Sequence, residues 1–593
     1  MQCRNLCASS TTRAAAPSPT ARICTAAPSA KGLTRPSSVP HAALPNLPSL
    51  PDSLSPPSSK SCLTSVFTPV NVLALEAELA GHPDRALVDT ILSDLRDGCR
   101  VGFSGNRSAS IVSNNLASAS ANPNIVDAYL EKECKLNHTS GPFDTPPFVP
   151  LRTSGMGVVP KKDGSHRLIM HLSAPAGNSV NDFIDREAVS FSMISIDTVC
   201  DHVRRMGRGA LLCKVDLRHA FRIIPVHPED RPLLGMCWRG KFYFDLVLPF
   251  GLRSSPFIFN RFADALAWIL RKNYSVDNLE HYLDDFINVS PPASFIPSST
   301  AAVHMATILQ VFDNLGIPVA EGADKVAGPN TTLTVLGLEI DTIAMEMRLP
   351  APKLQELRHR LANWSITQHC SKQELLSLIG LLAFAAKVVP AGRTFLRRLI
   401  DLSSSATALQ DTIALTATAQ EDIRWWQEML PLWNGKALIR DHYWCKAPDM
   451  ELFTDASGAG FGGFFQGEWF SSSWEAFPGQ AASAAIIWRE MVPVAMACAL
   501  WGHRWSGKKI LLHCDNKAVV QAWKTGSCKH SGVVELIRKA LRISALNNFI
   551  LLITHIAGAD NTIADALSRN QLSRFRSLAP EAESLPCNLP EIL

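Results

Sequence analysis

Acidic residues stand at the ends of short apolar runs in two separate parts of the chain. The run LLCKVD ends in Asp216, and NLEHYLDDFINVS reads as a hairpin with Asp284 and Asp285 at its turn, whereas MELFTD and ILLHCD end in Asp455 and Asp515. Adjacent carboxylates repel each other, and an ordinary hairpin turn more often carries Asn-Gly or Asp-Gly. Hard divalent cations such as Mg²⁺ bind carboxylate oxygens and would offset the repulsion. A lone Asp-Asp pair is nevertheless more often part of a solvated turn. The flanking residues are therefore needed to distinguish a metal site from a turn.

The composition is that of an ordinary globular chain with several domains. It has 593 residues, 46% of them hydrophobic, and a formal net charge of only +4, so any basic surface for nucleic acid must be local. The 15 cysteines are scattered, which argues against a structural zinc site and favours free thiols in a reducing, intracellular compartment, cytoplasmic or nuclear. The best candidate for a membrane span, Leu378 to Val389, is interrupted by Lys387 and predicts a buried helix instead.

Changes in composition and periodicity divide the chain into six segments. The first is rich in Pro, Ser, Ala and Thr and cannot bury enough apolar surface to fold, which predicts a disordered tail. Its low acid content would also suit an organelle transit peptide, but the prolines oppose the amphipathic helix that such a signal needs. Later segments predict a mixed α/β (α+β) multidomain fold. The segments are a tail (1–62), a helical N-terminal extension (63–138), a mixed segment (139–345), a helical one (346–447), a second mixed segment (448–572) and a C-terminal tail (573–593).

Three motifs around the first acidic cluster resemble those of reverse transcriptases. The tetrapeptide YLDD (282–285) resembles the YxDD box, VDLRHAFRIIPV around Asp216 resembles the first catalytic motif, and LPFGLRSSPFIFNRF resembles the motif that packs on the incoming nucleotide and template. The resemblance implies a right-hand polymerase with fingers and palm over 139–345 and a thumb or connection over 346–447. It also implies two Mg²⁺ or Mn²⁺ ions, which activate a 3′ hydroxyl and stabilise the leaving pyrophosphate. The implied metal contacts come from Asp216, Leu217, Asp284 and Asp285.

The same resemblance implies residues that bind substrate. Phe221 stands where these enzymes place an aromatic side chain that excludes a ribose 2′ hydroxyl, and the alternative is a core Phe. The fingers segment VPKKDGSHRLIMHLS offers donors to triphosphate oxygens, which Arg suits through its planar fork. For its lysines the alternative is a solvated basic turn. Lys325 stands where polymerases often keep a proton donor to pyrophosphate, and a surface Lys fits equally well. The implied substrate-binding residues are Lys161, Lys162, Arg167, Phe221, Phe250, Gly251, Tyr282 and Lys325.

Two positions depart from the usual pattern of the family. His171 follows RLIM where an acid is usual, and Phe250 stands where retroviral enzymes have Gln, although many retrotransposon enzymes have Phe. Neither residue contacts the metal carboxylates of the family. The run VLGLEI (Val335 to Ile340) predicts a strand that resembles the primer-grip region.

The second acidic cluster resembles the site of ribonuclease H. Glu490 stands at the predicted start of a helix, REMVPVAMACALW, with Pro493 tolerated in its first turn. Four acids at strand ends and a helix start can converge on one rim of a mixed sheet, where two divalent ions position water and the scissile phosphate. Ala follows Asp455 where an aspartic protease has Ser or Thr, which disfavours a protease. The implied catalytic residues of this ribonuclease H-like mixed-sheet domain are Asp455, Glu490, Asp515 and Asp565, which also hold the metals, and His555.

His555 precedes Asp565 in HIAGADNTIADALSR, as a loop histidine does in this family. There the histidine is credited with handling protons or product, and its titration range suits that task. A satisfied polar residue at a strand end is the alternative. Basic residues of the helical segment would follow the duplex backbone or else line a solvated helix face. They are Lys353, Arg358, Arg360, Arg393, Arg397 and Arg398.

The resemblance implies an RNA-directed DNA polymerase (a nucleotidyltransferase) that is also a ribonuclease H (an endonuclease). Its expected partners are an RNA or DNA template-primer, an RNA–DNA hybrid and deoxynucleoside triphosphates, contacted mainly at phosphate and sugar. RLIMHLSAPAGNSVNDFID and VVPAGRTFLRRLIDL look most like DIRS-type retrotransposons, which also encode a tyrosine recombinase, a candidate partner. Gypsy-type elements are the near alternative. We expect one product of such an element or a truncated copy.

Two alternatives to an active reverse transcriptase are compatible with parts of the sequence. A degenerate or co-opted copy would bind nucleic acid without chemistry, and the presence of all seven acids disfavours it without excluding it. An RNA-dependent RNA polymerase is disfavoured by Phe221 and by the ribonuclease H-like segment.

Overall fold

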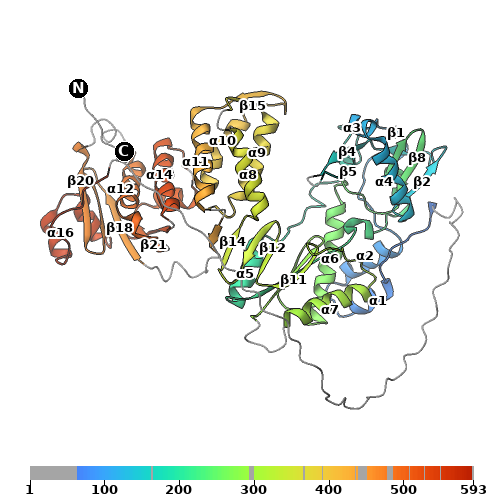
Figure 1. Ribbon diagram of the computed structural model, residues 1–593, viewed down its shortest axis with the longest axis horizontal. Coiled ribbons are helices and arrows are strands. Elements are labelled where there is room, and N and C mark those ends of the chain that lie inside the picture. The colour runs from blue at the N-terminus through green and yellow to red at the C-terminus, as the bar shows by residue number, and fades with distance from the viewer. Residues whose placement is uncertain are drawn as a thin grey trace, which may run out of the picture. The chain divides into compact units, whose positions relative to one another are not determined.

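The computed structural model describes residues 63–590, except 162–163, 293–299, 365–366, 390–391, 434–435, 439–449, 477–484, 507, 527 and 548. The predicted N-terminal tail (1–62) and Lys162 therefore lie outside the described residues. Internal contacts divide the chain into Met1–Ser58 and Ser59–Leu593, and all described residues belong to the second unit. That unit combines helices with parallel and antiparallel sheets, so the predicted mixed α/β class is confirmed (Figure 1).

Helices dominate the first described segment, as predicted. Helix α2 (Arg85–Arg96) begins at Asp84, whose side chain accepts a hydrogen bond from the Leu87 backbone N–H, and buries apolar residues at helical spacing. The short strand β1 (Ile111–Val112) lies between the helices of this segment. The other helices of this segment are α1 (Val72–Glu78), α3 (Ala117–Ala121) and α4 (Pro123–Lys135).

Two sheets make up the next region of the chain. A five-stranded sheet has the order β1-β3-β7-β8-β2, and a separate antiparallel hairpin pairs β4 with β5. Phe244 in β8 is fully buried beneath the larger sheet. The strands are β2 (Thr139–Phe143), β3 (Arg152–Thr153), β4 (Met156–Pro160), β5 (His166–Met170), β7 (Gly235–Trp238) and β8 (Lys241–Asp245).

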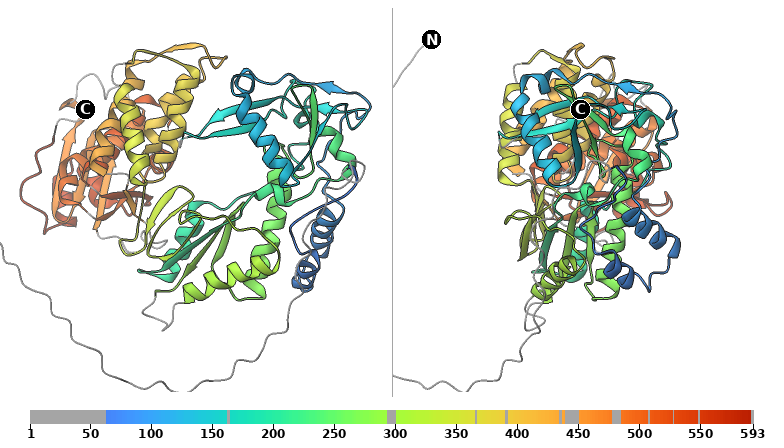
Figure 2. Two further views of the ribbon diagram at one scale, coloured as in Figure 1. Left: turned by 45° about the vertical axis from the view of Figure 1, so that its right-hand side comes forward. Right: turned by 90° about the vertical axis from the view of Figure 1, so that its right-hand side faces the viewer.

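A four-stranded antiparallel sheet with the order β11-β6-β10-β9 has helices packed on both faces. Its side chains alternate, because Phe286 packs in the core that includes α6 and α7, whereas Ile287 and Val289 pack in the core that includes α5. Figure 2 shows these elements in shades of green. They are β6 (Leu211–Asp216), β9 (Leu279–Tyr282), β10 (Asp285–Ser290), β11 (Val326–Asn330), α5 (Ile196–Met206), α6 (Ser255–Lys272) and α7 (Thr300–Asn314).

The run Val335–Ile340 is a hairpin, so the prediction of one strand there is wrong. Strand β12 (Thr332–Val335) turns into β13 (Leu338–Asp341) through Leu336 and Gly337, whose φ angles are +47° and +78°. Two consecutive positive φ angles are typical of the tightest hairpin turns, which usually carry Asn-Gly. Leu in place of Asn concealed the turn.

Helices again dominate the segment after β13, as predicted. Ser371 and Glu374 form a reciprocal capping box that begins α9 (Lys372–Ala385), in which Leu378 and Leu382 are buried, so the predicted buried helix is confirmed. In the part of the chain that the structure describes, no helix is both long and apolar enough to cross a membrane. The remaining elements are β14 (Glu346–Arg348), α8 (Ala351–Trp364), β15 (His369–Ser371), α10 (Arg397–Ser403), β16 (Thr412–Ala414), α11 (Ala417–Trp433) and β17 (Lys436–Leu438).

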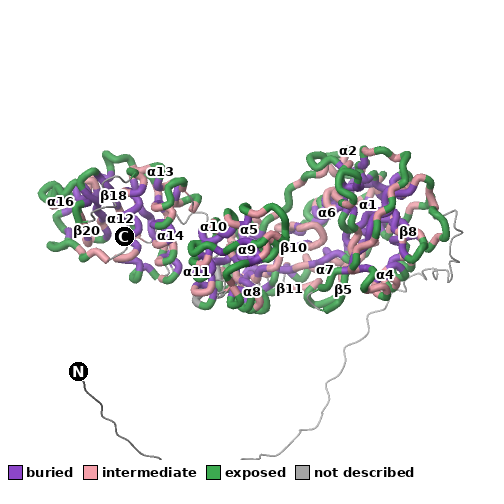
Figure 3. Tube along the Cα trace, turned by 90° about the horizontal axis from the view of Figure 1, so that it is seen from above, coloured by how far each residue is buried: buried purple, intermediate pink, exposed green. Residues whose placement is uncertain are grey.

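The C-terminal sheet has the order β20-β19-β18-β21-β22, with the first three strands antiparallel and the last three parallel. Helix α15 packs closely on β19, because a Cβ at Gly462 would lie 2.5 Å from the Leu567 Cβ. Figure 3 shows β18 and α12 among the buried segments. The elements are β18 (Met450–Ala456), β19 (Gly460–Phe465), β20 (Glu468–Ser473), α12 (Ile486–Trp501), β21 (Lys509–Cys514), α13 (Lys517–Thr525), α14 (Ser531–Leu546), β22 (Ile550–His555), α15 (Thr562–Ser568) and α16 (Leu572–Leu578).

Two expectations about this region are wrong. Helix α12 begins at Ile486, so Pro493 lies inside the helix rather than in its first turn. Burial of almost every residue from Glu490 to Cys498 supplies packing that a solvent-exposed helix would lack, and this compensates for the missing backbone N–H. The predicted C-terminal tail (573–593) begins with a packed helix instead, because Phe575 of α16 is fully buried against the Trp469 ring at 4.9 Å.

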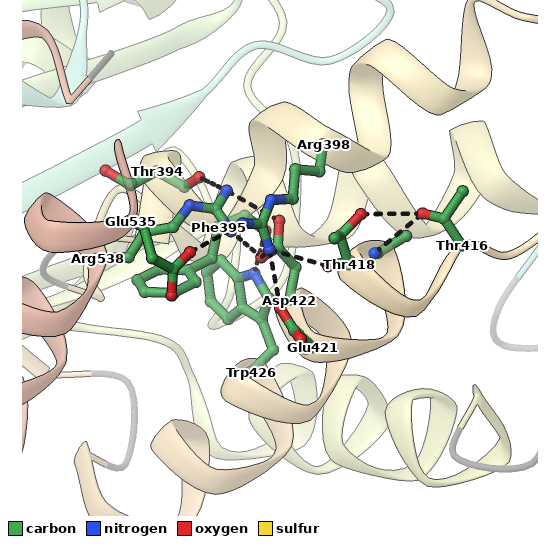
Figure 4. Close-up of polar contacts among 11 residues, drawn as sticks. Thr394, Phe395, Arg398, Thr416, Thr418, Glu421, Asp422, Trp426, Glu535 and Arg538 are labelled. Carbon is green, nitrogen blue, oxygen red and sulfur yellow. Dashed lines mark hydrogen bonds and ion pairs between the residues drawn. The ribbon is translucent and has the colours of Figure 1, made fainter. Parts of the chain in front are cut away.

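A buried polar junction joins the helical segment to the C-terminal sheet domain (Figure 4). The Arg538 guanidinium on α14 forms a two-pronged ion pair with Asp422 on α11, and both side chains are almost completely buried. Arg538 also donates to the Thr394 carbonyl at 2.9 Å and stands over the Phe395 ring. Arg398 on α10 adds one ion pair across the junction, with Glu535 on α14, and two within the helical segment, with α11. Its partners are Glu421, Asp422 and Glu535.

Candidate active sites

Two neighbouring strands bring the first acidic cluster together. Strands β6 and β10 are antiparallel, and their register sets Asp285 directly opposite Asp216. Asp284 occupies the turn between β9 and β10, as predicted, and its carbonyl accepts a hydrogen bond from the Leu217 N–H at 2.9 Å. Leu283 has a φ of +52°, a left-handed conformation that costs a non-glycine residue about 1–2 kcal/mol. Contacts with the surrounding residues therefore stabilise this turn, rather than the conformational preference of Leu283 itself.

The three carboxylates repel one another in a partly buried site. Burial raises the pKa of Asp284 to about 6, and the neighbouring charges of Asp216 and Asp285 add to this effect. Burial likewise raises the pKa of Asp285, whose Oδ1 is buried and accepts no hydrogen bond. An orphaned carboxylate oxygen beside two further acids fits a divalent cation with oxygen ligands.

Lys325 is the counter-charge of this cluster. Its Nζ donates to Asp216 Oδ2 at 2.8 Å, and its backbone carbonyl accepts from the Asp216 N–H. The hydrogen bond with Asp216 raises the pKa of Lys325, so the side chain stays protonated. The Lys325 side chain is 44% exposed, and its predicted role as a proton donor to pyrophosphate remains a prediction.

Aromatic residues lie near the strand end that carries Asp216. The Phe221 ring packs against Phe250 at 5.2 Å and Phe259 at 5.5 Å, and Phe250 is 53% exposed. Gly251 has a φ of +95°, and a Cβ there would approach the Met170 carbonyl oxygen to 3.0 Å. Tyr282 pairs with Asp285 across the hairpin. Phe221 is thus only partly buried, so one side of its ring could contact a bound ligand.

The basic residues of the fingers segment lie on a different sheet from these acids. Lys161 follows β4 and its N–H donates to the Ser165 carbonyl, while Arg167 lies on β5 opposite Val159. Both Lys161 and Arg167 are exposed. Their predicted role in binding triphosphate remains a prediction.

The second cluster combines a helix residue with two strand ends. Ligand atoms of Glu490, Cys514 and Asp515 lie within 4.8 Å of one another. Burial raises the pKa of Glu490 to about 9, with help from the charges of Asp455 and Asp515, and its Oε2 is buried without a hydrogen-bond partner. Burial also raises the pKa of Asp455 to about 6. These residues too fit a site for divalent cations.

Asp565 adjoins this cluster but is held differently. Burial opposes ionisation of Asp565, but hydrogen bonds from Arg569 at 2.6 Å and Arg574 at 2.8 Å hold its pKa below the usual value. Its charge in turn contributes to the raised pKa of Asp455. All four predicted acids therefore belong to one electrostatic site.

Two supporting hydrogen bonds were not predicted from the sequence. Ser568 donates to Asp455 Oδ2 at 2.6 Å, and Asn561 donates to the Thr454 carbonyl, which ties the loop after β22 to β18. The position of Ser568, one helical turn after Asp565, was the only available signal. His555 is exposed at the end of β22 and pairs in register with Cys514, next to Asp515. Its role in catalysis remains a prediction.

We expect Mg²⁺ to stabilise the folded chain more at about pH 7.5 than at about pH 5. Because the folded pKa values of Asp284 and Asp455 are raised from 3.8 to about 6, the folded state loses stability as the pH rises through that window. Above it both groups are charged and a divalent ion relieves their repulsion. Thermal unfolding with and without Mg²⁺, at ionic strength matched with NaCl, measures the shift in the midpoint temperature that Mg²⁺ causes at each pH. An equal shift at both pH values would contradict it.

Residues 159–340 match the family model described as reverse transcriptase (RNA-dependent DNA polymerase). The matched span contains the strands and turn that carry Asp216, Asp284 and Asp285. The chain carries a reverse transcriptase domain. It is of the type found in retroelement and viral polyproteins, and reverse transcriptases generally use divalent metals.

Curated relatives of the chain include viral proteins. Polyprotein P3 of Commelina yellow mottle virus is 22% identical over 428 residues, which cover 69% of this chain and 20% of that protein. The Gag-Pro-Pol polyprotein of mouse mammary tumor virus is 24% identical over 199 residues, covering 31% and 10%. Protein P of duck hepatitis B virus (strain China) is 30% identical over 145 residues, covering 24% and 17%. The chain spans at most 20% of the length of these three relatives.

Solved structures of foamy viral protease-reverse transcriptase are also similar to the chain. One, in complex with dsDNA, is 16% identical, covers 83% of this chain and 99% of that chain, and has a TM-score of 0.46. Another, in complex with an RNA/DNA hybrid, is 14% identical, covers 85% and 87%, and has a TM-score of 0.44.

Proposed function

We propose that the chain is an RNA-directed DNA polymerase of a retrotransposon that also cuts the RNA strand of RNA–DNA hybrids. The observation that carries the proposal is the register of β6 and β10, which sets Asp216 opposite Asp285 beside Asp284 inside the reverse transcriptase domain. Phosphoryl transfer needs several fixed oxygen ligands at one point, and adjacent antiparallel strands hold them rigidly.

In the polymerase reaction, the primer 3′ hydroxyl attacks the α-phosphorus of a deoxynucleoside triphosphate. A P–O bond to the primer forms while the bond to pyrophosphate breaks. Two Mg²⁺ or Mn²⁺ ions, held by Asp216, Asp284, Asp285 and the Leu217 carbonyl, would supply charge stabilisation to the attacking and leaving oxygens. Lys325, protonated beside Asp216, can give a proton to pyrophosphate.

The remaining residues of this site select and orient the nucleotide. Phe221 fills the space of a ribose 2′ hydroxyl, and Phe250 with Gly251 forms the apolar surface on which the nucleotide lies. Lys161, Lys162 and Arg167 neutralise the triphosphate. Tyr282 supports the turn that carries the acids.

In the nuclease reaction, water attacks the scissile phosphate of the RNA strand, and the 3′ oxygen leaves. Asp455, Glu490, Asp515 and Asp565 would hold two divalent ions that position both oxygens. The orphaned Glu490 Oε2 and the raised pKa values of Glu490 and Asp455 support this assignment. His555 handles protons or product at the exposed end of β22.

The decisive test of the polymerase is primer extension by the purified chain on an RNA template, with all four deoxynucleotides and Mg²⁺. Extension supports the proposal. If the unmodified chain binds the template-primer in a gel-shift assay but does not extend it, the chain is a copy that binds without chemistry.

For the nuclease, Asp515→Asn should lower cleavage of a labelled RNA–DNA hybrid by about 10²–10³-fold, because the neutral amide stabilises a cation much less than a carboxylate. Asp560→Asn is the matched control, because Asp560 is exposed on the adjoining loop. Primer extension should be unchanged in both variants. Cleavage by Asp515→Asn at the rate of the unmodified chain would refute the nuclease assignment.

The finer class of the element is part of the proposal. The runs RLIMHLSAPAGNSVNDFID and VVPAGRTFLRRLIDL favour a DIRS-type element over a gypsy-type one. A recombinase encoded by the same element is then a candidate partner, and pull-down of the purified pair would test it.

A further inference from the structure

A buried ionic network lies immediately beside Phe221. The Arg222 side chain is 5% exposed and donates to Glu133 Oε2 at 2.8 Å and to Asp245 Oδ1 at 2.8 Å. Thr139 donates its hydroxyl to the same Asp245 oxygen. One guanidinium thus contacts three segments that are distant in sequence. Such a buried ionic network is held in one arrangement, because separating the partners would leave a buried charge unpaired at a large cost in free energy.

A second contact holds the other end of the same segment. The His138 ring packs edge-on against the His219 ring at 5.1 Å, and His138 Nδ1 lies 3.0 Å from Glu133 Oε2. Glu133 therefore contacts both His138 and Arg222. Burial opposes ionisation of Glu133, but these two partners lower its pKa to about 2, so the carboxylate stays charged.

The segment between these anchors is strained. His219 and Ala220 have φ angles of +69° and +41°, in the left-handed region that non-glycine residues avoid at a cost of about 1–2 kcal/mol each. Such a conformation persists only where surrounding contacts hold it. His138 and Glu133 supply contacts at its two ends, and Phe221 stands between them.

We propose that Glu133 and His138 are positioning residues for nucleotide selection, because they hold the strained turn that orients Phe221. The inference rests on the proposed polymerase function. Both residues precede the matched reverse transcriptase span of 159–340, and no sequence motif indicated that they contact the residues that flank Phe221. The N-terminal helical segment is then part of the specificity site, rather than an appendage to it.

The experiment measures kcat/KM for incorporation of dGTP and of GTP opposite the same template base. Glu133→Gln keeps the shape and removes the charge, and His138→Ala removes the ring but leaves the Arg222–Asp245 pair. We expect each to lower the dGTP/GTP ratio by about 10-fold, since small misplacements of an orienting group carry effects of this size. Phe221→Val is the reference for a direct loss of selection, and Glu131→Gln on the exposed face of α4 is the matched control.

The ratio is insensitive to partial unfolding, because both efficiencies are measured on one preparation. If Glu133→Gln and His138→Ala lower both efficiencies equally, the network has only a structural role and the inference is wrong. If Glu133→Gln does not fold, His138→Ala alone decides. If the unmodified chain incorporates neither nucleotide although it is folded and binds the template-primer, the proposed function itself is refuted, and the inference with it.

Discussion

Asp285→Asn is expected to lower primer extension by about 10²–10³-fold while hybrid cleavage stays unchanged. The amide has the size of the carboxylate but no charge, so the strand and its register to Asp216 are preserved. Burial already raises the pKa of Asp285, and its Oδ1 has no hydrogen-bond partner to lose. The folded state should therefore be as stable as before, or more so, because one repulsive charge is removed.

This separation of effects makes Asp285 informative. Single-nucleotide incorporation under saturating dNTP measures the first activity, and cleavage of a labelled hybrid measures the second. Asp313→Asn, on the exposed side of α7, is the control for loss of an acid elsewhere in the same domain. Extension by Asp285→Asn at the unmodified rate would contradict the metal assignment. Loss of both activities would instead indicate misfolding.

Local patterns predicted the strands that carry the acids. Apolar runs that end in an acid, such as those ending at Asp216 and Asp515, indicate a buried strand that reaches the edge of its sheet. Each run is short, so its own residues determine its secondary structure. The hairpin at Asp284 was predicted for the same reason. The convergence of Asp216 with Asp285 depends on pairing between distant strands, and only the resemblance to a family suggested it.

The errors share a different cause. Pro493 suggested a later helix start than Ile486, because propensity ignores the packing that buries α12 on all sides. Leu336 concealed a turn whose conformation its neighbours impose. The burial of Phe575 follows from contact with β20, more than a hundred positions earlier, and no local pattern contains that contact. The network at Arg222 was missed for the same reason.

The junction of Figure 4 gives the second large effect, on stability. Arg538→Met should lower the free energy of unfolding of the C-terminal domain by up to about 3–5 kcal/mol, because the buried Asp422 carboxylate loses its two-pronged partner and keeps only the longer ion pair with Arg398 at 3.5 Å. It also removes the hydrogen bond from Arg538 to the Thr394 carbonyl. Urea denaturation followed by the fluorescence of the buried tryptophans measures this loss.

Arg542→Met is the matched control, because Arg542 lies on the same helix and pairs across the same junction with Glu428 on α11, at 2.8 Å. That pair is half-exposed, so its loss should cost less than about 1 kcal/mol. The double variant Asp422→Leu/Arg538→Met leaves no charge unpaired and should recover more than half of the loss. Equal costs for the two single variants would mean that burial of Asp422 does not make this junction rigid. A larger cost for Arg538→Met than for Arg542→Met would mean that the buried Asp422–Arg538 pair contributes more to the stability of this junction than the half-exposed pair.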